Sequence, residues 1–461
     1  MSDTGSGKRQ IHVCSLEMPT ISHNNYGLWA HPDNRKHLYH TIEFWRDCAR
    51  EAEAALLDAI FIADVLGVAD AFGGSMDTSI REGIHIPELD PMLLAAVGMG
   101  ATERLGWGVT VSASYEPPFG LARRMSTMDH LSDGRIGWNI VMSYHHNADE
   151  NHGIAPGSLP SFERYERGDD FMEVCYKLWE SSWDEDAVLA DRENGVYTDP
   201  RKVRRIDHAG EYYSCSGPHM VDPSPQRTPV LFQAGMSDRG RRFAAKHAEA
   251  VFFVARTLDG LKLSVEDLRR NASAFGRSRE EVLAMVQLNV ITAPTMAEAE
   301  DKVAEFQKWT RPEGYLAHEY GMSNFDPMKH PRERLLDEAL ALDGLTRQDS
   351  GTYGHGPEAT IGEIIDAAAD IRNEPMFVYG DPVTVADQIE SWFEEFDLDG
   401  YLLRNYVHPG TVRDFGRYVV PELQRRGRYR TDYEGSTLRE HFFGPGRKRL
   451  ADSHPGARHR A

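Results

Sequence analysis

Hydroxyl side chains stand at the ends of two predicted strands that a single predicted helix connects. Residues 107–112 and 136–141 are short apolar runs, and the helical pattern between them begins at Pro117 and ends at Ser132. Parallel strands joined by one helix bring their carboxyl ends to the same edge, where α/β folds bind their ligands. The hydroxyl residues at those ends are Ser112, Ser114 and Ser143. We therefore expect the chemistry of this protein at this edge.

The segment VLFQAGMSDRG, residues 230–240, has the pattern of a phosphate-binding turn. An apolar strand runs into Gly235, Met236 and Ser237, and a helix follows from Asp238. Free backbone N–H groups and the positive end of the helix dipole can hold a phosphate at such a turn, with Ser237 as a further donor. An ordinary strand-to-helix turn with Ser237 as the helix N-cap explains the same residues.

Other polar residues near predicted strand ends could orient a ligand. Asp64 follows the apolar strand 59–63, where its carboxylate could accept hydrogen bonds from the N–H groups of a bound heterocycle. A helix N-cap or a surface acid is an equally good explanation of Asp64. Asn139 lies in the strand 136–141, and Tyr165 starts a helix in a long insertion. Each could contact the polar edge of a ligand or make structural hydrogen bonds.

Several common cofactor sites find no support in the sequence. The histidine-rich loop with His145, His146, Asp149 and His152 lacks a recognised metal-ligand spacing, so we predict no metal site. The chain contains no GxxxxGK[ST] motif and no GxGxxG after a strand, so an ATP or NAD(P) site is not supported. It also lacks the GxSxG elbow of serine hydrolases.

About eight strand signals alternate with helical patterns along the chain. This order favours an α/β fold of the (β/α)8 TIM-barrel type over an open doubly wound sheet. Two irregular segments, about 144–228 and about 309–377, are too long for ordinary connections and predict insertions over the C-terminal rim. We expect one barrel domain over 1–444 and a basic tail over 445–461.

The composition limits the possible partners and location. The chain has 461 residues and a net charge of −21, which argues against nucleic acid or an anionic membrane as the main partner. Its four cysteines lack CxxC spacing and indicate reduced thiols. No signal peptide and no stretch of about 18 apolar residues is recognisable. We therefore expect a soluble, cytoplasmic protein.

Long stretches of the sequence resemble one enzyme family. They are GLWAHPDN, FIADVLG, RRMSTMDHLSDGRIGWNIVMS, EVCYKLWESSW, SPQRTPVLFQAGMSDRGRRFAAKHAEAVF and VVPELQRRGRYRTDYEG. The chain resembles the bacterial-luciferase-like flavin monooxygenases, in the subgroup of nitrilotriacetate, dibenzothiophene sulfone and long-chain alkane monooxygenases. The alkane enzymes are the nearest of these. The resemblance covers about residues 11–444.

The resemblance implies a two-component monooxygenase that binds reduced FMN, supplied by a separate flavin reductase, and activates O2 to oxygenate or cleave a small organic substrate. A reductase that handles NAD(P)H would explain the missing nicotinamide motif. The residues implied in flavin binding are Asp64, Thr110, Asn139, Ser143, Ser161, Tyr165, Met236 and Ser237. The candidates for acid–base catalysis are His23, His318 and Tyr144.

The predicted substrate wall departs from that of the alkane enzymes. The departures are Thr20, Ala69, His85 and Tyr144, all in loops that follow early strands. They favour a larger, more polar or heteroaromatic substrate over a long alkane. The alternatives are a deazaflavin-dependent oxidoreductase of the same superfamily and a non-catalytic flavin-binding protein. A homodimer or homotetramer is expected from the resemblance.

Overall fold

The computed structural model describes residues 8–143, 145–155, 158–235, 237–321, 323, 325–347, 356, 358–368 and 370–460. The chain splits into two compact units, which are described separately. Unit 1 comprises Met1–Ala101, Val254–Ser264 and Val286–Thr431. Unit 2 comprises Thr102–Phe253, Val265–Met285 and Asp432–Ala461.

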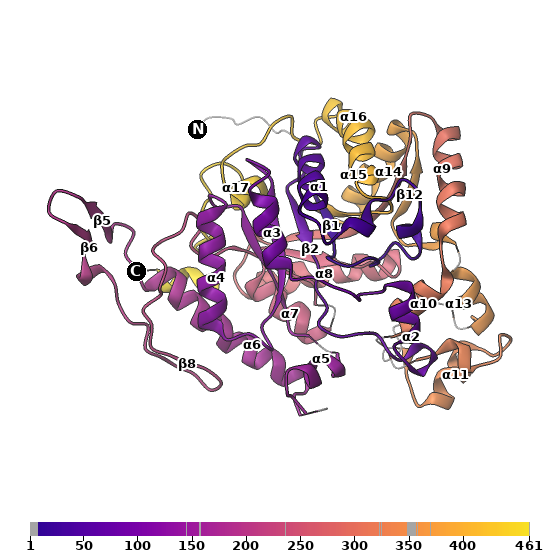
Figure 1. The fold of residues 1–461 in the computed structure, drawn as a ribbon, viewed down its shortest axis with the longest axis horizontal. Coiled ribbons are helices and arrows are strands. Elements are labelled where there is room, and N and C mark those ends of the chain that lie inside the picture. The colour runs from indigo at the N-terminus through magenta and orange to yellow at the C-terminus, as the bar shows by residue number, and fades with distance from the viewer. Residues whose placement is uncertain are drawn as a thin grey trace. The chain divides into compact units, whose positions relative to one another are not determined.

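Parallel strands form the centre of unit 1 (Figure 1). Strand β1 (His12–Glu17) pairs with β2 (Ala59–Ile62) and with β13 (Gly400–Arg404). Strand β11 (Leu283–Thr292) pairs through its second half with β12 (Phe377–Gly380). All four residues of β2 and all five of β13 are buried, as expected for strands covered on both faces.

Several helices of unit 1, among them α1 (Ile42–Ala54), begin at a residue whose side chain caps the helix. In α1, Thr41 accepts a hydrogen bond from the backbone N–H of Phe44, and Phe44, Trp45 and Cys48 are buried. The other helices wholly within this unit are α2 (Asp77–Glu82), α3 (Pro91–Met99), α9 (Met296–Trp309), α10 (Pro312–Gly321), α11 (Leu336–Asp343), α13 (Ile361–Ala367), α14 (Pro382–Glu395), α15 (Gly410–Asp414) and α16 (Val420–Arg425).

Unit 2 contains four parallel strands and two short hairpins. Its strands pair in the order β3 (Gly106–Ser112), β4 (Ile136–Val141), β9 (Val230–Gln233) and β10 (Ala250–Phe253). The hairpins are β5 (Val188–Asp191) with β6 (Val196–Thr198), and β7 (His208–Ala209) with β8 (Ser214–Cys215). Its helices are α4 (Pro118–Leu131), α5 (His146–Asn151), α6 (Ser161–Tyr176), α7 (Asp238–His247) and α17 (Leu438–Phe443), and α8 (Leu258–Ala274) belongs to both units.

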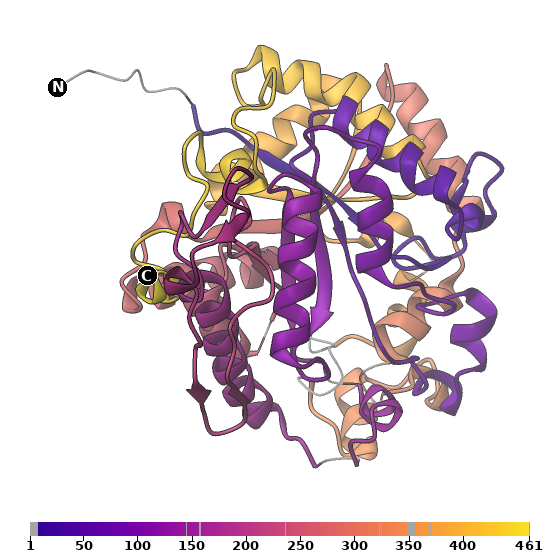
Figure 2. The same cartoon turned by 60° about the vertical axis from the view of Figure 1, so that its left-hand side comes forward.

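The final helix α17 is part of the core of unit 2. Arg439 is only 1% exposed, and its guanidinium pairs with Glu249 at 2.7 Å. The same side chain donates to the carbonyl oxygens of Thr228 and Pro229. Figure 2 shows the yellow C-terminal end beside the helix α6, and His459 lies 3.2 Å from Glu173 of that helix.

The order of parallel strands and helices is that of a (β/α)8 barrel, so the predicted fold class is confirmed. The segment of about 309–377, which we expected to be irregular, contains the helices α10 and α11. These helices are short and separated by Pro327 and Pro331, so they leave no long periodic pattern in the sequence. None of the described helices is both long and apolar enough to cross a membrane.

Candidate functional site

Polar side chains meet at the carboxyl ends of β3 and β4 in unit 2, as the sequence predicts. The hydroxyl oxygens of Ser112 and Ser143 are 2.8 Å apart, and the Asn139 amide donates to Thr110 Oγ1 at 2.9 Å. Asn139 is 4% exposed, and its Oδ1 has no hydrogen-bond partner among the described residues. A buried acceptor without a partner is costly, so this oxygen fits an N–H or O–H group of a ligand.

Ser143 has an unusual backbone conformation at this edge. Its φ is 46°, in the left-handed region that few residues other than glycine adopt. Such conformations cost on the order of 1–3 kcal/mol and persist where the surrounding structure holds them. The contact between Ser143 and Ser112 places the hydroxyl of this strained residue beside the end of β3.

Ser237, in the turn from β9 to α7, is the N-cap of α7, which is one of the two roles that the sequence predicts for it. Ser237 Oγ accepts a hydrogen bond from the backbone N–H of Gly240 at 3.1 Å. The Gly235 N–H donates to the side chain of Gln233 at 2.6 Å. Capping uses a lone pair of Ser237, so its hydroxyl hydrogen is still able to bind an anion. Met236 lies outside the described residues.

A second hydroxyl converges on the same turn. Tyr165 of α6 forms a hydrogen bond with Ser237, and burial raises the pKa of the Tyr165 phenol. A Cβ atom added at Gly240 would lie 2.6 Å from Tyr165 Oη and 3.0 Å from Ser237 Oγ. Because Gly240 has no side chain, the two hydroxyls can lie close to its backbone, beside the positive end of α7. We call this arrangement of Ser237 and Tyr165 over Gly240 the cradle. For Ser161, the described part is the backbone at the start of α6.

Nearby arginines are largely engaged in ion pairs. The Arg239 guanidinium lies 3.0 Å from the Asp169 carboxylate, and that of Arg241 lies 2.9 Å from Asp267. Each of these cations therefore has a carboxylate partner in the structure. The two hydroxyls and the helix N-terminus are the groups at this turn that most directly fit a phosphate.

Three histidines from distant parts of the sequence meet in unit 1. His23 follows β1, His85 follows α2, and His318 lies in α10. Their ring centroids are separated by 5.3 Å (His23 to His85), 5.6 Å (His23 to His318) and 4.6 Å (His85 to His318). Burial lowers the pKa of His23 and of His318, so both imidazoles are neutral at pH 7. The third acid–base candidate, Tyr144, lies outside the described residues.

The position of His318 depends on its helix and on a tyrosine. The α10 residues Leu316 and Tyr320 are buried in an apolar cluster that also contains residues of α11 and α13. The Tyr26 hydroxyl forms a 2.7 Å hydrogen bond with His318 Nδ1. This bond fixes the orientation of the ring and leaves Nε2 for another partner.

The two other predicted substrate-wall residues are buried in unit 1. Thr20 makes an antiparallel bridge with Glu88, and its Oγ1 has no hydrogen-bond partner in the described part of the chain. Ala69 packs against α10. A Cβ atom added at Gly321 of that helix would lie 2.6 Å from the Cβ of Ala69. Ala69 is therefore the close-packed neighbour of the helix that carries His318.

Asp64 has a carboxyl partner that the sequence did not reveal. Its side chain forms a hydrogen bond with Glu88, and the backbone N–H of Val65 donates to both carboxyl groups. Burial raises the pKa of Asp64, and the nearby charge of Asp90 raises it further. Burial and the charge of Asp64 raise the pKa of Glu88 more strongly. The two carboxyl groups therefore share a proton at neutral pH.

This shared proton predicts a pH dependence of stability. In the unfolded chain both carboxyl groups lose their protons near pH 4, whereas the folded pair still holds its shared proton at neutral pH. The folded state therefore binds more protons above that pH, and this contribution to stability falls as the pH rises. Glu88→Gln lacks the shared proton, so its free energy of unfolding should fall less than that of the parent as the pH rises. We expect the difference between pH 5 and pH 9 to be at least about 1.4 kcal/mol. Denaturant unfolding at both pH values measures the difference.

A matched control for this variant is Glu300→Gln, on the exposed side of α9. It removes the same charge without a carboxyl partner and should leave the pH dependence of the unfolding free energy unchanged. Equal pH dependence in Glu88→Gln and in the parent would contradict the shared proton.

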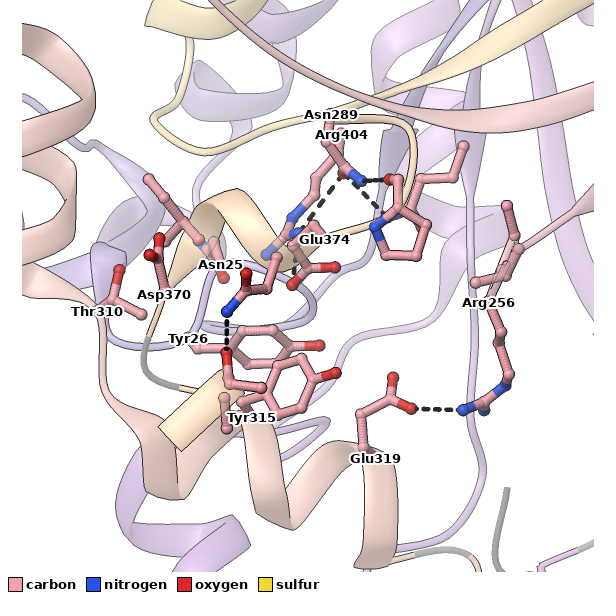
Figure 3. A pocket seen from close by; sticks show the side chains of 18 of the residues that line it. Asn25, Tyr26, Arg256, Asn289, Thr310, Tyr315, Glu319, Asp370, Glu374 and Arg404 are labelled. Carbon is pink, nitrogen blue, oxygen red and sulfur yellow. Dashed lines mark hydrogen bonds and ion pairs between the residues drawn. The ribbon is translucent and has the colours of Figure 1, made fainter. Parts of the chain in front are cut away.

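A polar cavity of about 160 Å³ lies in unit 1 (Figure 3). Two ion pairs stand in its wall, Arg404 with Glu374 at 3.1 Å and Arg256 with Glu319 at 2.9 Å. Its other polar and aromatic lining residues include Asn25, Tyr26, Gln287, Asn289 and Tyr315. Tyr26, through its hydroxyl, connects this wall to His318.

The cavity wall offers both donors and aromatic faces. The Arg404 guanidinium is 5.4 Å from the centre of the Tyr26 ring, and Tyr315 meets Tyr26 edge to face at 5.2 Å. The Nε of Arg404 and the Nδ2 of Asn25 have no hydrogen-bond partner among the described residues. Such a wall suits a planar guest with hydrogen-bond acceptors better than a saturated chain.

Comparisons with known proteins agree with this architecture. The model of the luciferase-like monooxygenase family matches residues 25–399. The long-chain alkane monooxygenase of Geobacillus thermodenitrificans (strain NG80-2) is 43% identical over 453 residues, 98% of each chain. A crystal structure of long-chain alkane monooxygenase has a TM-score of 0.90 at 43% identity, covering 98% of this chain and 100% of that one. A crystal structure of riboflavin lyase, with modified FMN and riboflavin as substrate, has a TM-score of 0.88 at 36% identity, covering 98% and 100%.

Proposed function

The chain belongs to the luciferase-like monooxygenase family, and from this premise we propose that it uses reduced FMN to oxygenate a small polar organic molecule. Membership makes it a flavin-dependent monooxygenase, so the predicted reaction class is confirmed. The observation that carries the choice of FMN is the cradle of Ser237 and Tyr165 over Gly240. A phosphate-bearing flavin fits two hydroxyls at a helix N-terminus.

Unit 2 would hold the phosphate and the polar side chain of the flavin. Ser237 and Tyr165 would both donate to the phosphate once it replaces the hydrogen bond between their two hydroxyls, and Asn139 Oδ1 would accept from a flavin hydroxyl or ring N–H. Thr110 is hydrogen-bonded to Asn139 and Ser143 to Ser112, and these hydroxyls would be further hydrogen-bonding groups for the flavin. The flavin roles of Asp64, Ser161 and Met236 stay predictions. Reduced FMN, when bound, supplies the electrons that activate O2.

His318 and His23 are the proposed acid–base residues. Both imidazoles are neutral, so each can accept a proton on one nitrogen and donate one from the other. With Nδ1 of His318 bonded to the Tyr26 hydroxyl, proton transfer falls to Nε2. Nε2 accepts a proton when Nδ1 carries the hydrogen, and donates one in the other tautomer. Tyr144 remains a predicted participant.

The proposed substrate is planar and polar, with carbonyl or ring-nitrogen acceptors. The unfilled donors of Arg404 and Asn25 would bind such acceptors, and the rings of Tyr26 and Tyr315 would contact a flat surface. A saturated alkane would leave these buried donors unsatisfied. The structurally similar riboflavin lyase has a substrate of the same chemical class.

The separate flavin reductase is part of the proposal, as is assembly into a homodimer or homotetramer. The sequence contains no nicotinamide-binding fingerprint, so the chain would not reduce the flavin with NAD(P)H itself. A separate reductase would supply the reduced flavin that reacts with O2. Delivery requires only that the reduced flavin diffuses to the monooxygenase. The cytoplasmic location stays a prediction.

An anaerobic titration of the protein with dithionite-reduced FMN tests the cofactor, and O2 uptake tests the substrate. We expect saturable binding of one FMN per chain and much weaker binding of a reduced 5-deazaflavin. With FMN, NADH and an added reductase, riboflavin should raise O2 uptake with a higher kcat/KM than hexadecane does. The physical reason is the polar wall around Arg404 and Asn25.

Three outcomes would contradict parts of this proposal. A preference for the deazaflavin would favour the hydride-transferring alternative. Flavin binding without any substrate-dependent O2 uptake, across both riboflavin and hexadecane, would favour the non-catalytic alternative. A higher kcat/KM with hexadecane would overturn the proposed substrate class while leaving the FMN site intact.

A further inference from the structure

We propose that His23, His85 and His318 form a binding site for a divalent transition metal such as Zn²⁺. Each histidine offers one ring nitrogen, and these three atoms lie within 4.8 Å of one another. No part of the flavin reaction proposed above requires a metal, so this site adds a second ligand to the protein.

The spacing of the three nitrogens is close to that of a metal centre. Zinc binds imidazole nitrogens at about 2.0–2.1 Å, so three ligands of a tetrahedral ion lie roughly 3.3–3.5 Å apart. Nitrogens within 4.8 Å reach that spacing after side-chain movements on the order of 1 Å. Three protein ligands leave the fourth position of the ion open to water or another small ligand.

The chemistry of the donors selects the class of metal. All three side chains of the cluster are imidazoles, which bind metals through a ring nitrogen in the neutral form. A site of three imidazoles suits Zn²⁺, Co²⁺, Ni²⁺ or Cu²⁺, whereas Mg²⁺ and Ca²⁺ prefer oxygen ligands. His145, His146 and His152, the histidines weighed as metal ligands from the sequence, are not part of this cluster.

A second residue already orients one of the ligands. Histidines that bind metals usually engage their other ring nitrogen in a hydrogen bond, which fixes the tautomer. His318 does so through Nδ1 and the Tyr26 hydroxyl, at 2.7 Å, and this leaves Nε2 for the ion. The Tyr26 oxygen accepts the Nδ1 hydrogen in that tautomer.

The fold holds His85 in place despite a backbone cost. Its φ is 54°, in the left-handed region, and the residue is only 3% exposed. The cations that act on His23 and His318 are balanced by carboxylates: Lys36 is paired with Glu17 at 3.1 Å, Arg404 with Glu374 at 3.1 Å and Arg256 with Glu319 at 2.9 Å. An incoming cation therefore meets histidine nitrogens and no unpaired positive charge from these three side chains.

The bound metal would hold the lone pairs that proton transfer needs. If His23 and His318 are the acid–base residues, Zn²⁺ acts as an inhibitor. This consequence rests on the proposed function. Binding itself is measured without flavin, O2 or substrate, so failure of the proposed function and failure of the metal site are distinguishable.

The test is a titration of the tag-free, chelator-treated protein with Co²⁺, followed by visible absorption. We expect one equivalent to produce the intense bands of tetrahedral Co²⁺, and Zn²⁺ to displace it and raise the Tm. His85→Gln and His318→Gln should each weaken Co²⁺ binding at least tenfold. The matched control is His40→Gln, which removes an exposed histidine from outside the cluster and should bind Co²⁺ as the parent does.

The proposal is overturned if one equivalent of Co²⁺ gives no tetrahedral spectrum, or if both cluster variants bind as tightly as the parent. Thermal unfolding without metal identifies a variant that does not fold, and His23→Gln then replaces it in the comparison. Loss of the Zn²⁺-induced Tm increase in a folded variant supports the site independently of the spectrum.

Discussion

Replacing Arg439 with methionine is expected to lower the free energy of unfolding by about 3–5 kcal/mol. Arg439 and Glu249 are both buried in unit 2 and pair at 2.7 Å. Methionine fills a similar volume but leaves the Glu249 carboxylate buried without its cation. The carbonyls of Thr228 and Pro229 lose a donor at the same time. Urea unfolding of the parent and the variant measures the loss.

A double variant and a surface control make this prediction specific. Arg439→Met combined with Glu249→Leu removes both charges, so we expect it to recover part of the lost stability. Arg458→Met removes an arginine that is mostly exposed and only 3.7 Å from its partner Glu173, and it should change stability by less than about 0.5 kcal/mol. A loss below about 1 kcal/mol in Arg439→Met would show that water or another group replaces the guanidinium.

Replacing Gly240 with alanine should weaken the binding of reduced FMN by about 10- to 100-fold. The new Cβ would lie 2.6 Å from Tyr165 Oη and 3.0 Å from Ser237 Oγ, so at least one hydroxyl must move. A hydrogen bond to a charged group contributes about 1.5–3 kcal/mol, which corresponds to this range of affinity. The anaerobic titration with reduced FMN gives the Kd of the variant.

Gly120→Ala is the matched control for the flavin site. Gly120 lies in α4, and a Cβ there would meet only the Pro117 ring at 3.5 Å, an ordinary contact. The same change of residue should therefore leave the Kd for FMN unchanged. If Gly240→Ala bound FMN as tightly as the parent while remaining folded, the cradle would not be the phosphate site.

Local patterns were enough to predict the barrel and the pair of parallel strands whose ends meet at one edge. The apolar runs of β3 and β4, with a single helix between them, require parallel strands whose ends meet. Thr110 and Asn139 consequently form one hydrogen bond across the two strands, and Ser112 and Ser143 form another at the strand ends. Ser237 could be predicted as a cap because the residue type and the start of α7 are both visible in the sequence.

Contacts between distant segments could not be predicted from the residues alone. Glu88 has no local signal that pairs it with Asp64, because their shared proton arises from burial of two loops together. His85 joins His23 and His318 only once α10 is packed in its own apolar cluster. Arg404 ends the apolar strand β13. Its ion pair with Glu374 could not be predicted, because no local pattern connects this strand to the earlier segment that carries Glu374.

The membership of α17 in unit 2 has a consequence for biosynthesis. The ribosome releases Thr102–Phe253 long before Asp432–Ala461, although both segments belong to the same compact unit. With elongation at about 5–20 residues per second, roughly 10–40 s separate the two. During that interval the nascent chain exposes the carboxylate of Glu249 and the backbone carbonyls that later receive Arg439. Unit 2 is therefore completed only after its last segment has left the ribosome.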